Sequence, residues 1–290
     1  MPNIITTNNL RKTNVAIIAS KVRYLCEVII KSFIARQRDR ACPFCNSSEK
    51  SELMNKVFFI KLFRCNNCGL MFRYPKDSVT SRNYRDSCYY WEPKISILPN
   101  SAGLTGLKIN DFKGGIYDIS DKITLIKKYI KEGNMLDYGA SWGYHLWQFI
   151  HEGFSGTGYE IDIKRARFGG RNLGLKIISD PKGLEQLGSS FGIVFANHVL
   201  EHITDIRNEF GRIYRLLKDA GYLFVFVPDC GAIVNEPWRK TYVFGQRHSL
   251  AFDEGFFTKN LYSLGFKIIE IARRPDECEL IVVARKMNKL

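Results

Sequence analysis

Two kinds of apolar segment are missing from this sequence. No apolar run is long enough to span a bilayer, and the N-terminus has no unbroken apolar core followed by a small-residue cleavage site. These absences argue against a transmembrane anchor and a secretory leader. We therefore expect a cytoplasmic protein that is at most peripheral to a membrane. With 45% hydrophobic residues among 290, the chain can still form one large or two modest domains.

Acidic residues are scarce in the N-terminal part of the chain. Residues 1–118 carry 19 Lys and Arg against nine Asp and Glu, and they contribute +10 of the formal charge of +14. Such an excess favours an anionic partner: a nucleic acid, a phosphorylated sugar carrier or a membrane surface. An ordinary solvated surface explains it equally well. Because no run interleaves basic with aromatic residues, as a nucleic-acid groove would, nucleic acid is the less favoured partner.

Cysteine is used in a pattern that differs from a disulfide framework. Four of the eight cysteines form two Cys-x-x-Cys pairs, Cys42 with Cys45 and Cys65 with Cys68, and nineteen residues separate the pairs. Each pair forms a tight knuckle that directs two thiolates at one ion, and four thiolates leave no open coordination position. We therefore predict a structural zinc ribbon over residues 41–74, with a strand at 57–63 that leads into the second knuckle. A redox dithiol is the alternative.

The segments that flank the predicted ribbon differ in character. Within residues 1–40, apolar residues recur at steps of three and four from Val15 to Phe33, which predicts a basic amphipathic helix. That helix would pack on its own protein or on a second copy, or it would lie on an anionic membrane surface. Residues 75–118 contain several prolines and glycines and are predicted to be an irregular linker. Four aromatic residues in the linker would pack against the next domain or form a lid: Tyr84, Tyr89, Tyr90 and Trp91.

The most informative stretch is a strand, a small-residue loop and a helix over residues 134–150. The strand leads into Asp137, the loop runs from Gly139 to Gly143, and Glu160 follows the next predicted strand, 23 residues after Asp137. An acidic residue at that distance can accept hydrogen bonds from both hydroxyls of a ribose. The Gly-x-Gly-x-x-Gly pattern of a dinucleotide site is absent. A carboxylate before the first glycine would repel a pyrophosphate and would suit a cationic ligand.

The rest of the chain after residue 119 predicts a parallel sheet with helices on both faces. Strands at 191–197 and 222–227 have almost no polar alternation, which is typical of strands buried on both sides. Further elements are expected in this order: helix 120–132, helix 162–173, strand 175–178, a helix from Ile206 to Leu217, a turn at 218–221, helix 253–264, and strands 266–271 and 278–284.

These stretches together resemble the class I S-adenosylmethionine-dependent methyltransferases. Residues 135–143 are similar to the family's first motif, with Ser141 where the middle glycine usually stands, and residues 191–228 are similar to its FD-x-V, LEH and LLKPGG region. The resemblance covers residues 120–286 and implies a Rossmann-like, doubly wound, seven-stranded α/β sheet in a domain spanning residues 119–290. With the ribbon included, the chain is similar to zinc-ribbon methyltransferases that act on sugar nucleotides and surface polysaccharides. Sugar C-methyltransferases of that type have a further C-terminal domain that this sequence lacks, so O-methylation is favoured.

The resemblance also implies a set of site residues. The cofactor would be bound by residues in the loop and after the following strands: Asp137, Gly139, Ser141, Gly143, Glu160, Ile161, Asp180 and Asn197. Asp137 would meet its methionine amine, Glu160 its ribose and Asp180 its adenine. A sugar hydroxyl requires a general base, for which His248 and His198 are candidates, whereas His202 is interpreted as the family's packing histidine.

Two other functions are compatible with the same residues. An RNA methyltransferase would also combine a zinc module with a basic N-terminal part. A non-catalytic binding module would keep the fold for a partner, although such a module would have no need of Asp137 and Glu160. The favoured acceptor is a small molecule or a glycan.

Overall fold

The structure is a computed structural model of the whole chain, and it describes residues 41–57, 60–74, 97–231 and 248–288. Of the first 40 residues it describes only Cys26 and Ile30, which are both helical. The predicted amphipathic helix therefore lies almost entirely outside the described residues, as does the predicted cluster of four aromatic residues in the linker. No helix within the described ranges is long and apolar enough to cross a membrane.

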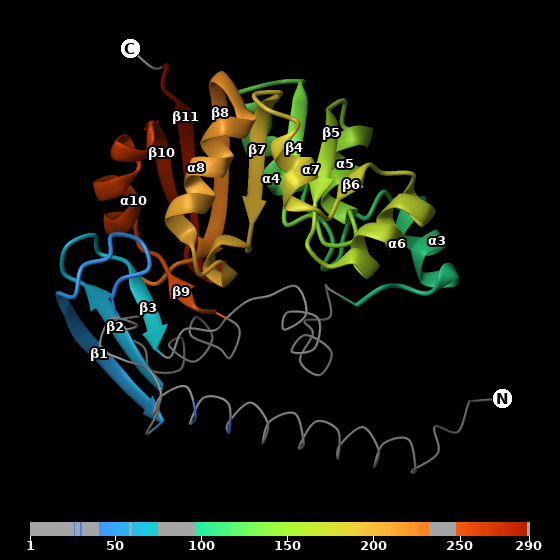
Figure 1. Cartoon of the computed structure of the whole chain (residues 1–290). Helices are drawn as coiled ribbons and strands as arrows, with labels where there is room; N and C mark the ends of the chain where they lie inside the picture. The colour runs from blue at the N-terminus through green and yellow to red at the C-terminus, as the bar shows by residue number, and fades with distance from the viewer. Residues whose placement is uncertain are drawn as a thin grey trace, which may run out of the picture.

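A seven-stranded sheet forms the centre of the molecule, in the order β10-β11-β8-β7-β4-β5-β6 (Figure 1). The five strands from β6 to β8 are parallel, whereas β11 is antiparallel to both β8 and β10. Their bounds are β4 Asn134–Tyr138, β5 Ser155–Tyr159, β6 Ile177–Ile178, β7 Phe191–Asn197, β8 Leu217–Pro228, β10 Phe266–Arg274 and β11 Glu279–Lys286. This arrangement confirms the predicted seven-stranded, Rossmann-like α/β fold.

Alternate residues of each central strand face opposite layers of helices. In β4, Met135 packs with α4 (Ser120–Lys127) and α5 (Tyr144–His151), whereas Leu136 packs on the other side with α8 (Ile206–Leu216). Helix α10 (Glu254–Asn260) packs on the same side as α8, because its Phe256 and Phe257 belong to the same hydrophobic cluster as Leu136 and α8. Asp137 is two residues beyond Met135, so its side chain points toward the α5 side.

Several predicted boundaries are corrected by the structure. Helix α4 ends at Lys127, and the helix predicted at 253–264 divides into α10 and a 3-10 turn at Tyr262–Leu264. Helix α6 (Ile163–Leu173) begins one residue later than predicted, because Asp162 is its capping residue. The turn predicted at 218–221 lies inside β8 as an irregularity in the pairing, because these four residues lie opposite the single residue Gly192 of β7.

The segment predicted as an irregular linker contains a helix, α3 (Ser101–Ile109). Asn100 caps this helix by accepting a hydrogen bond from the Gly103 N–H. Two glycines inside the helix, Gly103 and Gly106, weaken its sequence signal because glycine has a low helix propensity. Shortly afterwards, Phe112 is buried against the ring of Trp147 and anchors the segment to the sheet domain.

The cysteine-rich segment forms a second, four-stranded sheet in the order β1-β2-β3-β9. The strand predicted at 57–63 is confirmed in its second part, where β2 (Ile60–Cys65) leads into the second knuckle, but its start is corrected because Val57 is the last residue of β1 (Lys50–Val57), which pairs antiparallel with β2. Strand β3 (Met71–Tyr74) then pairs with β9 (Leu250–Ala251), which comes from the far end of the chain. The ribbon is thus hydrogen-bonded to a segment of the larger domain, as Figure 1 shows at its lower left.

The two sheets also share one hydrophobic core. The ring of Phe44 meets that of Phe256 edge-to-face at 5.1 Å between centroids, and the Asn260 side chain donates to the carbonyl of Cys68 at 2.8 Å. Arg64 forms an ion pair with Asp253 beside these contacts. The ribbon is therefore held against α10 by apolar, polar and charged contacts together.

Candidate functional site

The loop after β4 has a backbone that few side chains tolerate. Gly139, Ser141 and Gly143 all have positive φ, at 84°, 50° and 90°. A Cβ at Gly139 would lie 2.7 Å from Val199 Cγ2, and a Cβ at Gly143 would lie 2.5 Å from a Leu175 methyl carbon. Both glycines are therefore required by conformation and by space. Ser141 adopts the left-handed conformation at the position where the resembled motif has glycine.

Asp137 presents a buried carboxylate with unused hydrogen-bonding capacity. Its relative exposure is 0%, and neither carboxylate oxygen has a hydrogen-bond partner among the residues that the structure describes. Nδ1 of the His145 imidazole lies 3.7 Å from Oδ1. A buried carboxylate without hydrogen bonds is costly to a folded protein, so this group is suited to a bound ligand that donates to it.

Glu160 braces the same loop. One carboxylate oxygen accepts from the Ser141 N–H at 2.9 Å, and the other accepts from the Asp162 N–H at 2.7 Å. Burial raises the pKa of Glu160 to about 7, and these two backbone hydrogen bonds lower it only in part. Each oxygen keeps a second lone pair that a ligand hydroxyl could use.

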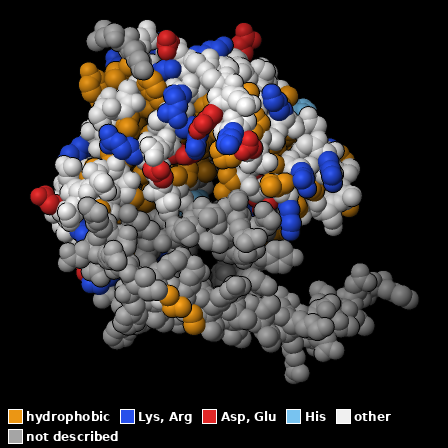
Figure 2. Space-filling model, viewed as in Figure 1, with side chains coloured by type: hydrophobic (Ala, Val, Ile, Leu, Met, Phe, Trp, Pro, Cys, Tyr) orange, Lys and Arg blue, Asp and Glu red, His pale blue; other side chains and the backbone are white. Residues whose placement is uncertain are grey.

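Further polar atoms that make no hydrogen bond to any described residue lie around Asp137 and Glu160. They include the Ser141 hydroxyl, the Asn197 carbonyl oxygen at the end of β7, and Nδ1 of His145. The Asn197 amide nitrogen lies 3.2 Å from Nε2 of His145 and links β7 to α5. These groups gather at the carboxyl ends of the parallel strands, where ligands of doubly wound sheets bind. Figure 2 shows a recess on one face of the molecule, rimmed by charged side chains of both signs.

Sequence reasoning did not identify His145, which lies in the first turn of α5. Its signal in the sequence is a polar residue among apolar neighbours immediately after the glycine loop. The other cofactor candidates divide into two groups. Ile161 lies between Glu160 and Asp162, and the Asp162 N–H donates to the Glu160 carboxylate. Asp180, in contrast, is exposed and caps a short helix by accepting a hydrogen bond from the Gly183 N–H. Asp180 has no contact with the loop among those observed.

His198, a candidate base, lies between two carboxylates. Its Nδ1 is 3.3 Å from Glu201, its Nε2 is 3.0 Å from Glu279, and Lys122 also pairs with Glu279. Burial alone would lower the pKa of His198, but the two carboxylates outweigh burial and raise it to about 9. An imidazole that is protonated at neutral pH is poorly suited to accept a proton, so this environment favours a positioning role for His198.

His248, the other candidate base, lies immediately before β9 and next to a residue of the LEH segment. Its ring centroid is 4.8 Å from that of His202, and these two side chains and Glu201 bring one ligand atom each within 4.8 Å of one another. The backbone N–H of Ser249 donates to the Glu201 carbonyl at 3.0 Å and fixes the position of this loop. His202, predicted to be a packing residue, is thus half-buried beside His248.

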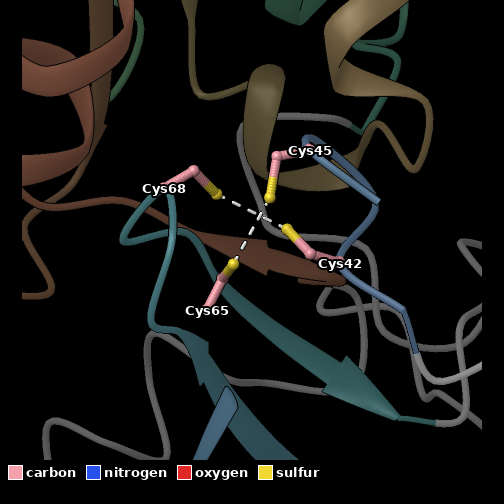
Figure 3. A group of neighbouring side chains, drawn as sticks. All are labelled: Cys42, Cys45, Cys65 and Cys68. Atoms are coloured by element: carbon pink, nitrogen blue, oxygen red, sulfur yellow. Dashed lines mark hydrogen bonds between the residues drawn. The ribbon is translucent and has the colours of Figure 1, made fainter. Parts of the chain in front are cut away.

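The four cysteines of the two predicted knuckles converge on one point (Figure 3). Sγ of Cys42 is 3.5 Å from that of Cys68, and Sγ of Cys45 is 3.4 Å from that of Cys65. A tetrahedral zinc ion with Zn–S bonds of about 2.3 Å places its sulfur atoms about 3.8 Å apart. The four thiols therefore fit a zinc ion with only small adjustments.

Comparison with known protein families identifies the family of the larger domain. A family model described as a methyltransferase domain matches residues 113–271, which is more than half of the chain. The chain therefore belongs to the methyltransferase-domain family, and the protein is an S-adenosylmethionine-dependent methyltransferase. A comparison with curated protein sequences finds no match.

Solved structures with a similar fold include several methyltransferases. The 1,6-didemethyltoxoflavin-N1-methyltransferase of Burkholderia thailandensis is 18% identical, with coverage of 66% of this chain and 92% of that chain and a TM-score of 0.45. The PH0226 protein of Pyrococcus horikoshii OT3 is 17% identical, with coverage of 71% and 98% and a TM-score of 0.49. A SAM-dependent methyltransferase of Archaeoglobus fulgidus is 16% identical, with coverage of 64% and 100% and a TM-score of 0.45.

Proposed function

We propose that this methyltransferase binds S-adenosylmethionine in the β4 loop and transfers its methyl group to a hydroxyl of a sugar, a sugar nucleotide or a polysaccharide precursor. The observation that carries the cofactor site is the carboxylate of Asp137, which is fully buried and accepts no hydrogen bond from any described part of the chain. The ammonium group of the cofactor's methionine end would donate to it. Charge-assisted hydrogen bonds of this kind are among the strongest in proteins.

The ribose of the cofactor would bind at Glu160. Its two oxygens are already oriented by the N–H groups of Ser141 and Asp162, so the carboxylate is held in place before the ligand arrives. The backbone of Gly139 and Gly143, at positive φ and packed closely on Val199 and Leu175, would give the loop the shape that the cofactor binds against. Ile161 would pack beside the ribose. Asp180 remains our candidate for the adenine amine, although it would first have to turn away from its helix cap.

The groups at the carboxyl ends of β7 and β8 support the proposal of a hydroxyl acceptor. The methyl group of a sulfonium is already activated, so the protein has mainly to orient the acceptor and remove its proton. Asn197 ends β7, and the β8 loop leads to His248. Of the two candidate bases, His248 is the better suited to accept a proton. The basic character of residues 1–118 suits an acceptor that carries phosphate, such as a nucleotide sugar.

The ribbon would hold one zinc ion through Cys42, Cys45, Cys65 and Cys68. All four coordination positions would be filled by thiolates, which suits a structural role. Through β3 and β9 this ion would stabilise the segment that carries His248. The predicted contact of the N-terminal helix with a membrane surface or a second copy stays a prediction.

The proposal is tested by incubating the protein with S-adenosylmethionine carrying a ¹³C-methyl group and with pools of nucleotide sugars, polysaccharide fragments and RNA. We expect a new O-methyl resonance in the carbohydrate pool. Label in RNA alone would support the RNA methyltransferase alternative. Cofactor binding by titration calorimetry, with no transfer to any pool, would support the binding-module alternative instead.

A further inference from the structure

A second cluster of metal-binding side chains lies outside the ribbon. Glu201 and His202 come from the 3-10 turn Leu200–His202 after β7, and His248 comes from the loop before β9. One ligand atom from each lies within 4.8 Å of the other two. Ligands of one ion with bonds of about 2.1 Å lie roughly 3 Å apart, so a closure of less than about 2 Å completes the site. Rotation of two half-buried imidazoles can supply such a movement.

Glu201 gives an independent indication of a missing ligand. The residue is 1% exposed, and within the described ranges neither carboxylate oxygen makes a hydrogen bond. The contact with Nδ1 of His198 at 3.3 Å involves one oxygen and lacks hydrogen-bond geometry, so it does not satisfy the carboxylate. The hydroxyl of Ser249, next to His248 in the chain, is also buried without a hydrogen bond. Buried acceptors of this kind are expected where an ion or an ordered ligand binds.

The chemistry of the three donors selects a class of ion. Two imidazoles and one carboxylate suit divalent first-row transition metals such as Mn²⁺, Fe²⁺, Co²⁺ or Zn²⁺. Three protein ligands leave coordination positions open, unlike the closed set of four cysteines. We propose that Glu201, His202 and His248 bind such an ion near the carboxyl ends of β7 and β8, and that the open positions bind the acceptor hydroxyl.

This inference rests on the proposed function and gives His248 a different role within it. With the hydroxyl bound to the ion, its O–H bond is more acidic and the proton leaves to solvent. The oxygen lone pair then forms the new bond to the methyl carbon, the carbon–sulfur bond breaks, and its electron pair stays on sulfur. The products are a methyl ether, S-adenosylhomocysteine and one proton, and nothing is oxidised or reduced. His248 is then a ligand of the ion, and the transfer needs no imidazole base.

The ribbon would support this second site through the backbone. The Arg73 N–H donates to the Ser249 carbonyl at 2.9 Å, and the Ser249 N–H donates to the Glu201 carbonyl at 3.0 Å. The first bond joins β3 of the ribbon to the loop of His248, and the second joins that loop to the turn of Glu201. All three ligands are therefore held at the junction of the ribbon and the large sheet.

The test uses Mn²⁺ as the probe, because it is paramagnetic and its hard-ligand preference keeps it from replacing zinc at four thiolates. The full-length protein with its zinc in place is titrated with Mn²⁺ and followed by electron paramagnetic resonance. We expect one Mn²⁺ site per chain in the wild type and in His151→Ala, a matched substitution of an exposed histidine at the end of α5. Glu201→Gln and His248→Ala should each weaken Mn²⁺ binding by at least about 100-fold, since loss of an outer-shell partner alone costs 10–100-fold.

Cofactor binding and turnover separate this inference from the proposed function. The two variants should still bind S-adenosylmethionine, which shows that they are folded, and Mn²⁺ should stimulate methyl transfer by the wild type but not by Glu201→Gln. Equal Mn²⁺ binding by wild type and both variants, or no Mn²⁺ binding by a wild type that binds the cofactor, would overturn the metal site and leave the proposed function standing. Failure of the wild type to bind S-adenosylmethionine would instead overturn the proposed function.

Discussion

The raised pKa of Glu160 makes cofactor affinity depend on pH. Burial raises this pKa to about 7, so without ligand the carboxyl group is about half protonated at pH 7. A protonated carboxyl has fewer acceptor sites for ribose hydroxyls and lacks the negative charge that a sulfonium favours. If only the carboxylate binds, the apparent dissociation constant rises by a factor of 1 + 10^(7−pH), which is about 11 at pH 6 and about 1.1 at pH 8. We therefore expect S-adenosylmethionine to bind about tenfold more weakly at pH 6 than at pH 8.

The same shift acts on stability in the opposite direction. Because the folded pKa lies above the ordinary glutamate value of 4.5, the folded state binds this proton more tightly than the unfolded chain. The resulting stabilisation is fully present below pH 4.5 and is lost as the pH rises through 7. A shift of this size corresponds to about 3 kcal/mol. Ligand-free protein should thus lose this contribution in the pH range where cofactor affinity rises.

Titration calorimetry at pH 6, 7 and 8 and constant ionic strength measures the effect. Glu160→Gln cannot titrate, so its affinity should be weaker at pH 8 and should lack the Glu160-dependent slope. The matched control is Glu132→Gln, which changes an exposed carboxylate outside the proposed cofactor site and should keep the wild-type slope. A wild-type affinity that does not change between pH 6 and pH 8, or an unchanged slope in Glu160→Gln, would refute the reasoning.

Three further predictions concern the loop and the ribbon. Asp137→Asn should weaken S-adenosylmethionine binding by about tenfold or more, because it removes the negative charge opposite the ammonium group, and calorimetry showing wild-type affinity would contradict that role. Gly139→Ala should lower the melting temperature, because the added Cβ would lie 2.7 Å from Val199 and the backbone φ is 84°. The control is Gly106→Ala inside α3, where an added Cβ has no atom within 4 Å, and it should leave the free energy of unfolding unchanged or raise it by up to about 1 kcal/mol. Cys65→Ser should contain no zinc by elemental analysis, and its methyl transfer should fall because the ribbon supports His248 through the pairing of β3 with β9, while cofactor affinity stays within about threefold. The control Cys278→Ser should keep its zinc. A zinc-free Cys65→Ser protein with full turnover would contradict the link to His248.

Local sequence signals predicted the centre of the fold well. The buried strands β4 and β7, the glycine loop and the acidic residue after β5 follow one another within about sixty residues, and each has a physical signature of its own. The two cysteine knuckles are equally local, and only their convergence on one point needed the structure. The parallel order followed from apolar strands that alternate with amphipathic helices.

Contacts between distant parts of the chain could not be predicted in the same way. The pairing of β3 with β9 joins segments about 180 residues apart, and β9 itself is only two residues long. Nothing in the local pattern of Leu250 and Ala251 marks them as an edge partner of the ribbon. Likewise, the meeting of His248 with Glu201 and His202 depends on that pairing, although the adjacent Glu and His of the LEH segment were a visible signal.

The central claim is that this chain transfers a methyl group from S-adenosylmethionine to a hydroxyl at the carboxyl ends of β7 and β8. The most direct measurement is the identity of the atom that receives a ¹³C-methyl label, read by nuclear magnetic resonance and mass spectrometry of the purified product. The account predicts a single O-methyl group on a carbohydrate acceptor, with formation abolished in Asp137→Asn and Glu160→Gln double-variant protein. Label on a nitrogen or carbon atom, or labelling that persists in the double variant, would contradict it.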